Sequence, residues 1–159
     1  MKFNKAIKNL FIVLFSTLLI SACSTAKKAN VDTANDVYTG TDTVEFLAKG
    51  VPDRIFFATN KSKLTTASRD TLRKQATWMR KNKDVTVTVE GHADERGTRE
   101  YNLALGERRA NAARDYLMTY GISGKRISTI SYGKEKPVNP ASSPLSWSQN
   151  RRSVTVKVN

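Results

Sequence analysis

The stretch from Glu90 to Asn102 (EGHADERGTREYN) concentrates the side chains of this chain that are best suited to chemistry. It holds the only histidine, His92, with Asp94 two residues later and Glu95 directly after that. Imidazole and carboxylate groups can ligate a metal, transfer protons or hold a charged ligand. Each of these three roles needs different support from the rest of the chain.

Metal binding and catalysis lack that support. A catalytic zinc site usually has three protein ligands, most of them imidazoles or thiolates, and this chain has one histidine and one cysteine, Cys23. Hydrolysis by His92 and Asp94 lacks a serine or cysteine nucleophile in an activating context. Adjacent carboxylates such as Asp94 and Glu95 rarely face one sugar from opposite sides, as a glycosidase requires. The residues therefore favour binding without metal or catalysis, with His92 packed and hydrogen-bonded at a strand end.

The surrounding sequence predicts a two-layer α/β sandwich with the element order βαβαββ. Four segments have the apolar or alternating pattern of strands: 54–57, 84–90, 127–132 and 154–158. Two segments have a helical period, 65–81 and 98–120. Thr65 or Thr66 can cap the first, and Thr98 can cap the second. Right-handed crossovers would make the first three strands neighbours in a mostly parallel part of a mixed sheet, with both helices on one face. Small residues on the buried side of the second helix, among them Gly106, predict that it approaches the sheet closely.

The loop between the second strand and the second helix carries the chemically interesting stretch. Ligand sites favour loops at the carboxyl ends of strands in open α/β sheets, and Asp94 lies just beyond such an end. Arg109 lies further along the following helix and can point back over the loop. Asp94 and Arg109 would then either present opposite charges across a shallow pocket or form a structural ion pair.

The N-terminus has the composition of a bacterial export signal. Three lysines precede an apolar run of 11 residues (10–20), which is too short to span a membrane as a helix of about 20 residues. A single cysteine in an exported protein needs an explanation, and the sequence Ser21-Ala22-Cys23 resembles the end of a lipoprotein signal. In that class the cysteine becomes the mature N-terminus and carries N-acyl and S-diacylglycerol chains such as palmitate. By the same resemblance, Ser24 at the next position, rather than an aspartate, implies that the lipoprotein is sorted to the outer membrane.

The chain is expected to have three parts: a signal peptide (1–22), a flexible acylated tether (23–50) and one globular domain (51–159). A flexible tether of about 27 residues would average roughly 30 Å end to end and reach about 90 Å when extended. Without the three lysines of the signal peptide the net charge of +13 falls to +10, which predicts anionic surroundings: lipid headgroups, cell-wall polymer or nucleic acid. Export makes nucleic acid the poorest of these, and a solvated basic surface without a partner is the simpler alternative.

Three motifs in the predicted domain resemble those of a known family. Residues 89–113 (VEGHADERGTREYNLALGERRANAA) resemble the signature of the OmpA C-terminal-like domain family, in its peptidoglycan-associated lipoprotein branch. Residues 131–137 (SYGKEKP) and 150–152 (NRR) are similar to further motifs of that family, and the resemblance covers about 54–158. It implies a non-enzymatic lipoprotein on the periplasmic side of the outer membrane. Such a protein binds peptidoglycan as part of the Tol-Pal system of envelope integrity and cell division.

The resemblance also implies roles for individual residues. Asp94 matches the aspartate that receives the ammonium group of diaminopimelate in the peptidoglycan stem peptide, and Arg109 matches the arginine that holds its carboxylate. Gly91 and Gly97 would let backbone N–H groups approach the ligand. The other expected pocket residues are Phe57, Thr98, Asn102 and Leu105. Asn102 could instead serve only to fix the loop.

The implied partners are peptidoglycan, the outer membrane through the lipid on Cys23, a TolB-like periplasmic propeller and, as a second candidate, TolA. No nucleic acid, metal or cofactor is implied. One departure concerns Ala58, which stands where many relatives have an aspartate, so that binding would be weaker or rely more on backbone contacts. Two alternatives remain: an enzyme that releases muropeptides, and a basic module that binds any polyanion.

Overall fold

A computed structural model of the chain describes residues 31–158, apart from 33 and 35. The expected signal peptide (1–22) and Cys23 lie outside the described residues. Within the described part, no helix is long and apolar enough to cross a membrane.

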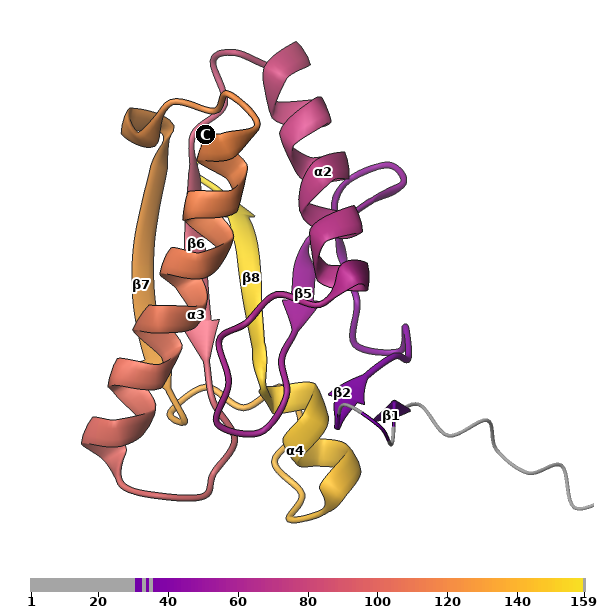
Figure 1. Ribbon diagram of the computed structural model, residues 1–159, viewed down its shortest axis with the longest axis vertical. Helices are drawn as coiled ribbons and strands as arrows, with labels where there is room; N and C mark the ends of the chain where they lie inside the picture. The colour runs from indigo at the N-terminus through magenta and orange to yellow at the C-terminus, as the bar shows by residue number, and fades with distance from the viewer. Residues whose placement is uncertain (1–30, 33, 35, 159) are drawn as a thin grey trace, which may run out of the picture.

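A four-stranded mixed sheet forms one layer of the fold (Figure 1). In spatial order its strands are β5 (Arg54–Phe56), β8 (Arg152–Lys157), β6 (Val87–His92) and β7 (Ile127–Gly133). The last strand, β8, runs antiparallel to both β5 and β6, and only β6 and β7 are parallel neighbours. The predicted mixed sheet is confirmed, but the first three strands are not consecutive neighbours. The alternating pattern of 154–158 marks a half-buried strand and does not specify its partners, and β8 pairs between β5 and β6.

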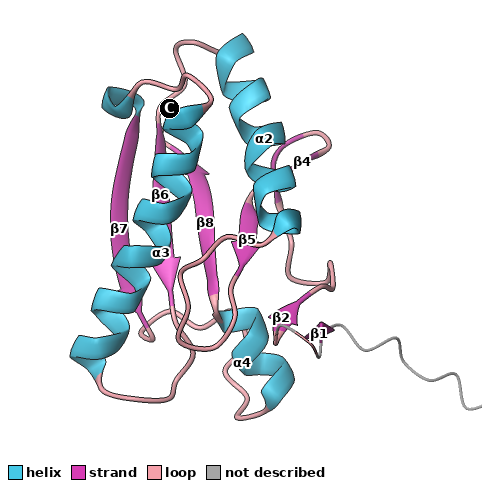
Figure 2. Ribbon diagram, viewed as in Figure 1, coloured by secondary structure: helices cyan, strands magenta, loops and turns pink. Residues whose placement is uncertain are grey.

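Two long helices cover one face of the sheet (Figure 2). They are α2 (Thr66–Lys81) and α3 (Arg99–Thr119). Each begins at the predicted threonine, since Thr65 accepts a hydrogen bond from the Ser68 backbone and Thr98 accepts one from the Tyr101 backbone. The core between the layers is formed by buried side chains of the helices and the sheet: Ile55, Phe57, Leu72, Met79, Val87, Val89, Leu117, Ile122 and Ile127.

A further short helix, α4 (Pro144–Asn150), lies between the third and fourth predicted strands, where Pro137, Pro140 and Pro144 indicate a loop and no helix was expected. Its side-chain cap is Ser143, which accepts a hydrogen bond from the Ser146 backbone, and Pro144 occupies the first turn, where its missing N–H costs nothing. Two turns are too short for a helical period to be visible in the sequence. A single 3₁₀ turn, η1 (Gly124–Arg126), precedes β7.

The N-terminal segment packs against the domain within the range that was expected to be tether. Two small hairpins form here, β1 (Val31–Asp32) with β2 (Val37–Tyr38) and β3 (Phe46–Ala48) with β4 (Val51–Pro52). Val37, Tyr38 and Leu47 are buried, and the Tyr38 ring meets the Phe56 ring edge-on at 4.7 Å. The packed part of the chain therefore begins before residue 51, because Val37 and Tyr38 form a buried cluster with Phe56 of β5.

Two glycines allow the close approach of α3 to the sheet that the sequence predicts. A Cβ atom on Gly91 of β6 would lie 1.8 Å from the Gly106 carbonyl oxygen of α3, and a Cβ on Gly106 would lie 2.3 Å from Ser131 Oγ. Gly91, which was expected to let a ligand approach, is therefore buried under the helix.

We expect Gly91→Ala to destabilise the fold by about 1–3 kcal/mol, because the new methyl group forces α3 away from β6. The loss would be seen as a lower midpoint of urea-induced unfolding. Gly124→Ala is a suitable control, since its Cβ would lie 3.4 Å from the flexible end of Met118, and it should change stability by less than about 0.5 kcal/mol. Equal stability of the two variants would contradict the proposed close packing.

Candidate functional site

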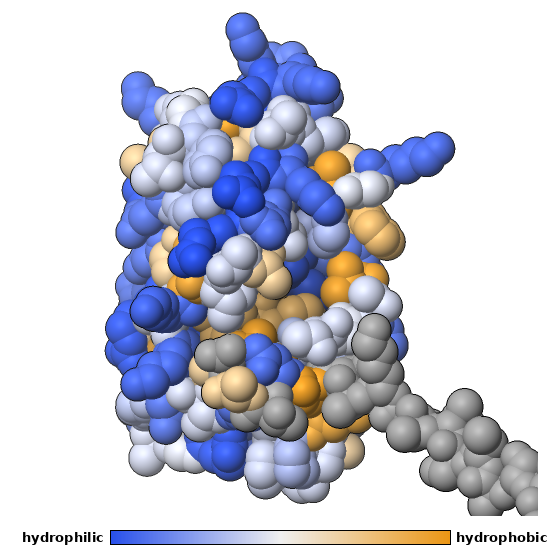
Figure 3. All heavy atoms as spheres, turned by 45° about the vertical axis from the view of Figure 1, so that its right-hand side comes forward, coloured by the Kyte–Doolittle hydropathy of each residue, from blue (hydrophilic) through white to orange (hydrophobic). Residues whose placement is uncertain are grey.

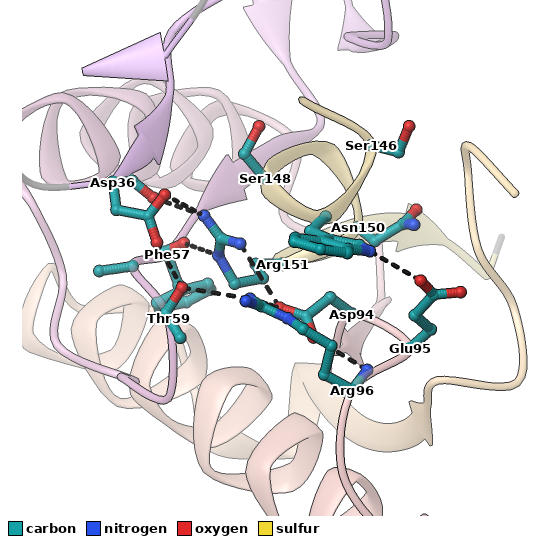
Figure 4. Close-up of polar contacts among 12 residues, drawn as sticks. Asp36, Phe57, Thr59, Asp94, Glu95, Arg96, Ser146, Ser148, Asn150 and Arg151 are labelled. Carbon is teal, nitrogen blue, oxygen red and sulfur yellow. Dashed lines mark hydrogen bonds and ion pairs between the residues drawn. The ribbon is translucent and has the colours of Figure 1, made fainter. Parts of the chain in front are cut away.

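Asp94 lies two residues beyond the end of β6 and is almost fully buried. Its carboxylate accepts three hydrogen bonds from Arg96: from the backbone N–H at 3.1 Å, from Nε at 3.1 Å and from Nη2 at 2.7 Å (Figure 4). Arg151 Nη1 lies 3.4 Å from the same carboxylate. The acid is thus held by two arginines, one from its own loop and one from the end of α4.

The charge state of Asp94 follows from these contacts. Burial alone would raise the pKa of its carboxyl group, but the hydrogen bonds and charge of Arg96, with the charge of Arg151, outweigh burial and lower the pKa below its ordinary value. Asp94 is therefore ionised at neutral pH and presents a fixed negative charge.

Arg151 is a central residue of the site that sequence reasoning did not single out. Its guanidinium is buried and donates to the Phe57 carbonyl at 3.1 Å and the Asp36 carbonyl at 2.6 Å (Figure 4). It also forms ion pairs with the carboxylates of Asp36, at 3.0 Å, and Asp94. One side chain thus joins the N-terminal segment, the end of β5 and the loop after β6. The NRR motif at 150–152 was the available signal, but nothing in its spacing indicates these partners.

Arg109 is fully buried, and its described partners are backbone carbonyl groups. Its guanidinium donates to His92 at 2.7 Å, to Lys61 at 2.9 Å and to Ala58 at 3.1 Å, and it lies 5.2 Å from the centre of the Phe57 ring. Burial, and then the neighbouring charge of Arg151, lower the pKa of Arg109 to about 9, although the charge of Asp94 acts in the opposite direction. Even so, the guanidinium is charged at neutral pH.

Asp94 and Arg109 are neighbours without being a pair. Within the described residues, the ion pairs of Asp94 go to Arg96 and Arg151, while Arg109 fixes the backbone on both sides of the pocket. The alternative of a direct structural ion pair between Asp94 and Arg109 is therefore wrong.

The other expected pocket residues mostly support this arrangement from within. Phe57 and Leu105 are buried, and Thr98 is the cap of α3. Asn102 is also buried and donates to the Arg96 carbonyl at 2.9 Å, and this hydrogen bond helps to fix the loop. Gly97 has φ of +90°, a value that favours glycine, and its main chain turns the loop into the helix.

A groove of about 610 Å³ lies beside this cluster, between the N-terminal segment, the 58–66 segment and the start of α2. It is lined by Ala34, Asp36, Val37, Ala58, Thr59, Lys61, Lys63, Leu64, Thr65, Thr66 and Arg69. Thr59 hydrogen-bonds to the Asp36 carboxylate, and Lys61 and Ala58 are the residues whose carbonyls bind Arg109. Figure 3 shows that hydrophilic side chains dominate this side of the molecule, with smaller apolar areas between them. The groove therefore combines basic and apolar side chains. Its residues Asp36 and Thr59 contact Arg151 and Arg96, the two arginines that bind Asp94.

His92 is packed as expected but lacks the expected hydrogen bonds of its ring. Its ring lies 5.6 Å from the Tyr132 ring, and its Nε2 lies 3.6 Å from the Glu90 carboxylate. Neither ring nitrogen has a hydrogen-bond partner of good geometry among the described residues, although the Lys136 backbone favours the charged form. Burial, followed by the charges of Arg152, Lys136 and Arg54, lowers the pKa of His92 to about 3. His92 is therefore neutral and structural. No group of three or more histidine, cysteine, aspartate or glutamate side chains is placed to hold a metal within 31–158 as described.

We expect Arg109→Lys to destabilise the protein by about 2–4 kcal/mol. A lysine has a single ammonium group and cannot donate to three carbonyls at the positions that the planar guanidinium reaches. Each buried carbonyl left without a donor lowers the free energy of unfolding by about 1–3 kcal/mol. Arg108→Lys, one residue earlier on the exposed side of α3, is the matched control and should be close to neutral. Thermal unfolding of both variants provides the comparison, and an unchanged Arg109→Lys would show that these hydrogen bonds contribute little.

The lowered pKa of His92 predicts a loss of stability in mild acid. Below about pH 6.5 the unfolded chain takes up a proton that the folded chain rejects until about pH 3, so the free energy of unfolding falls as the pH falls through this window. The slope should approach about 1.4 kcal/mol per pH unit below pH 6. His92→Gln removes the only histidine and should flatten the slope between pH 6.5 and 5, whatever its own effect on stability at pH 7. A slope that persists in the variant would exclude His92 as its source.

Comparisons with known proteins agree on one family. A model of the OmpA family matches residues 56–151. The chain is 48% identical over 149 residues to a peptidoglycan-associated lipoprotein of Rhizobium meliloti, covering 91% of this chain and 85% of the relative. It is 45% identical over 150 residues to a protein of the same name from Brucella melitensis, covering 91% and 89%.

A solved structure gives the same answer for the fold. The peptidoglycan-associated lipoprotein from Burkholderia pseudomallei superposes with a TM-score of 0.65 at 34% identity, over 66% of this chain and 89% of that one. The names of these relatives describe an association rather than a reaction, in line with the expectation that this chain is not an enzyme. The chain therefore belongs to the OmpA family, in the branch of the peptidoglycan-associated lipoproteins.

Proposed function

We propose that this protein binds peptidoglycan without chemistry, through the diaminopimelate residue of the stem peptide. The observation that carries the proposal is the ionised carboxylate of Asp94 at the end of β6, in a chain 48% identical to a peptidoglycan-associated lipoprotein. The end of the diaminopimelate side chain carries both an ammonium and a carboxylate group. It therefore needs a hydrogen-bond acceptor of negative charge and a donor of positive charge a few ångströms apart.

Asp94 is assigned to the ammonium group and Arg109 to the carboxylate. A guanidinium has five N–H donors, and Arg109 uses three of them on carbonyls, which leaves two for a ligand. Because Arg109 is fully buried, a carboxylate reaches it only when the segment that contains Ala58 and Lys61 moves aside. This movement would replace one or more carbonyl contacts by charged ones, which are stronger hydrogen bonds.

The rest of the stem peptide is assigned to the groove beside Asp94. Lys61, Lys63 and Arg69 line it and would attract the carboxylates of the peptide. Gly97, Thr98 and Asn102 hold the loop that carries Asp94, while Phe57, Gly91 and Leu105 hold the core beneath it. With Ala58 in place of an aspartate, the pocket relies on its backbone carbonyl at that position.

We also propose an anchored location for this domain. Cys23 would carry N-acyl and S-diacylglycerol chains in the inner leaflet of the outer membrane, and the chain ahead of the packed segment would tether the domain in the periplasm. Each buried CH₂ group contributes about 0.8 kcal/mol to anchoring, so several long chains hold a protein on the membrane essentially permanently. A TolB-like propeller and TolA are the proposed protein partners, within a role in envelope integrity and cell division.

The test is sedimentation of the purified full-length protein with diaminopimelate-containing peptidoglycan. Asp94→Asn should weaken binding by about 2–5 kcal/mol, because it removes one member of a desolvated charge pair. Asp115→Asn, which makes the same change of charge at an exposed position of α3, should bind as the parent does. Thermal unfolding of both variants confirms that any loss of binding is not a loss of folding.

Competition distinguishes the proposal from its alternatives. Free diaminopimelate should release the bound protein, while an equal concentration of a simple dicarboxylic acid should not. A basic module that binds any polyanion would ignore diaminopimelate and lose binding steeply with salt. An enzyme would instead release soluble muropeptides on long incubation. Either result, or normal binding by a folded Asp94→Asn variant, would reject the assigned site.

A further inference from the structure

The position assigned to the ligand ammonium group already holds a cation of the protein itself. Arg96 places Nε at 3.1 Å and Nη2 at 2.7 Å from the two carboxylate oxygens of Asp94. Its Nη2 also lies 3.4 Å from Thr59 Oγ1, and its guanidinium carbon lies 4.3 Å from the centre of the Trp147 ring. Asp94, Thr59 and Trp147 thus surround a cation with a carboxylate, a hydroxyl and an aromatic face. The contacts of Arg96 with Asp94 and Thr59 are drawn in Figure 4.

The three residues that surround the Arg96 guanidinium are held in place by contacts that do not involve the Arg96 side chain. Trp147 belongs to α4, and its indole N–H donates to the Glu95 carboxylate at 2.8 Å, which also accepts from Ser142 at 2.6 Å. Thr59 is bonded to Asp36. The carboxylate of Asp94 keeps its contact to Arg151, and the Arg96 backbone N–H donates to it whatever the side chain does. Departure of the Arg96 side chain would therefore leave a formed site for another cation.

The Arg96 side chain is also the part of the cluster that can move at low cost. It is 43% exposed, whereas the side chains of Asp94 and Arg151 are 9% and 2% exposed. An arginine that is 43% exposed regains water when it leaves the carboxylate, which offsets part of the lost ion pair. A long side chain can also keep its contact with the Trp147 ring while its guanidinium turns away from the acid.

We infer that the Arg96 side chain is a built-in competitor for the ligand ammonium group at Asp94, so that ligand binding is an exchange of one cation for another. This inference rests on the proposed function. Its consequence is that every cation has to displace Arg96, which lowers the affinity of all of them for Asp94 by the same factor. A simple amine would make only the contacts with Asp94 that Arg96 loses. Diaminopimelate in a stem peptide would add contacts of its carboxylate and of the peptide in the groove. The exchange thus leaves isolated cations weakly bound and keeps the Asp94 carboxylate neutralised when no ligand is bound.

The test removes the competitor and measures affinity. The probe is a soluble stem tripeptide that ends in meso-diaminopimelate, titrated into the full-length protein by calorimetry. Arg96→Gln should bind it about two- to tenfold more tightly than the parent, because the ligand no longer displaces a charge-assisted ion pair. Arg96→Lys, which keeps a competing cation, should stay within about twofold of the parent. Arg96→Gln should also strengthen the binding of ethylamine, a simple amine, by a similar factor, because both ligands displace the same side chain.

Unimproved binding by Arg96→Gln would indicate that Arg96 has a purely structural role. If Arg96 serves only to hold the loop in place, its loss would leave the Asp94 side chain less well positioned. Arg96→Gln would then bind the tripeptide as the parent does or more weakly, and this result overturns the inference. Asp94→Asn separates this failure from failure of the proposed function. Loss of binding in Asp94→Asn together with unimproved binding in Arg96→Gln rejects only the exchange. Unchanged binding in folded Asp94→Asn rejects both.

Discussion

The ion pair between Arg151 and Asp94 joins parts of the chain that are far apart in sequence, and the geometry of the site depends on it. Burying a guanidinium is costly unless its charge is paired and its donors are used. Arg151 meets both conditions through Asp94, Asp36 and the Phe57 carbonyl. The position of Asp94 is therefore coupled to the packing of the N-terminal segment and of α4. Neither of these belongs to the four strands and two long helices of the sandwich.

A second constraint comes from the contact between β6 and α3. Gly91 and Gly106 let the helix lie so close to the strand that no side chain fits between them. This approach places Arg109 where its guanidinium reaches carbonyls on both sides of the pocket. Burial, and then the charge of Arg151, lower the pKa of Arg109, while the charges of Arg96 and Arg151 stabilise the ionised form of Asp94. The result is an acid set among arginines, which suits a ligand that carries both signs of charge.

Sequence reasoning was most accurate where the information is local. Thr65 and Thr98 cap the two long helices as predicted, because capping depends on a side chain and a backbone N–H only three residues apart. It was wrong about strand order, because pairing is decided between segments about a hundred residues apart. It also missed α4 and the packing of Tyr38 on Phe56, since two helical turns and a few buried residues leave no period to detect.

The sequence by itself determined the fold class, the family and the importance of the stretch from Glu90 to Asn102, because these depend on motifs and on local periodicity. It pointed to Asp94 and Arg109 but could not say how they are used. Only the tertiary structure decided that Arg109 holds carbonyls, that Arg151 pairs with Asp94, and that Arg96 lies in the place assigned to a ligand cation. The physical reason is that a charged side chain pairs with the groups that the fold brings within about 3 Å of it. These groups come from segments that are distant in sequence, so no single segment specifies them.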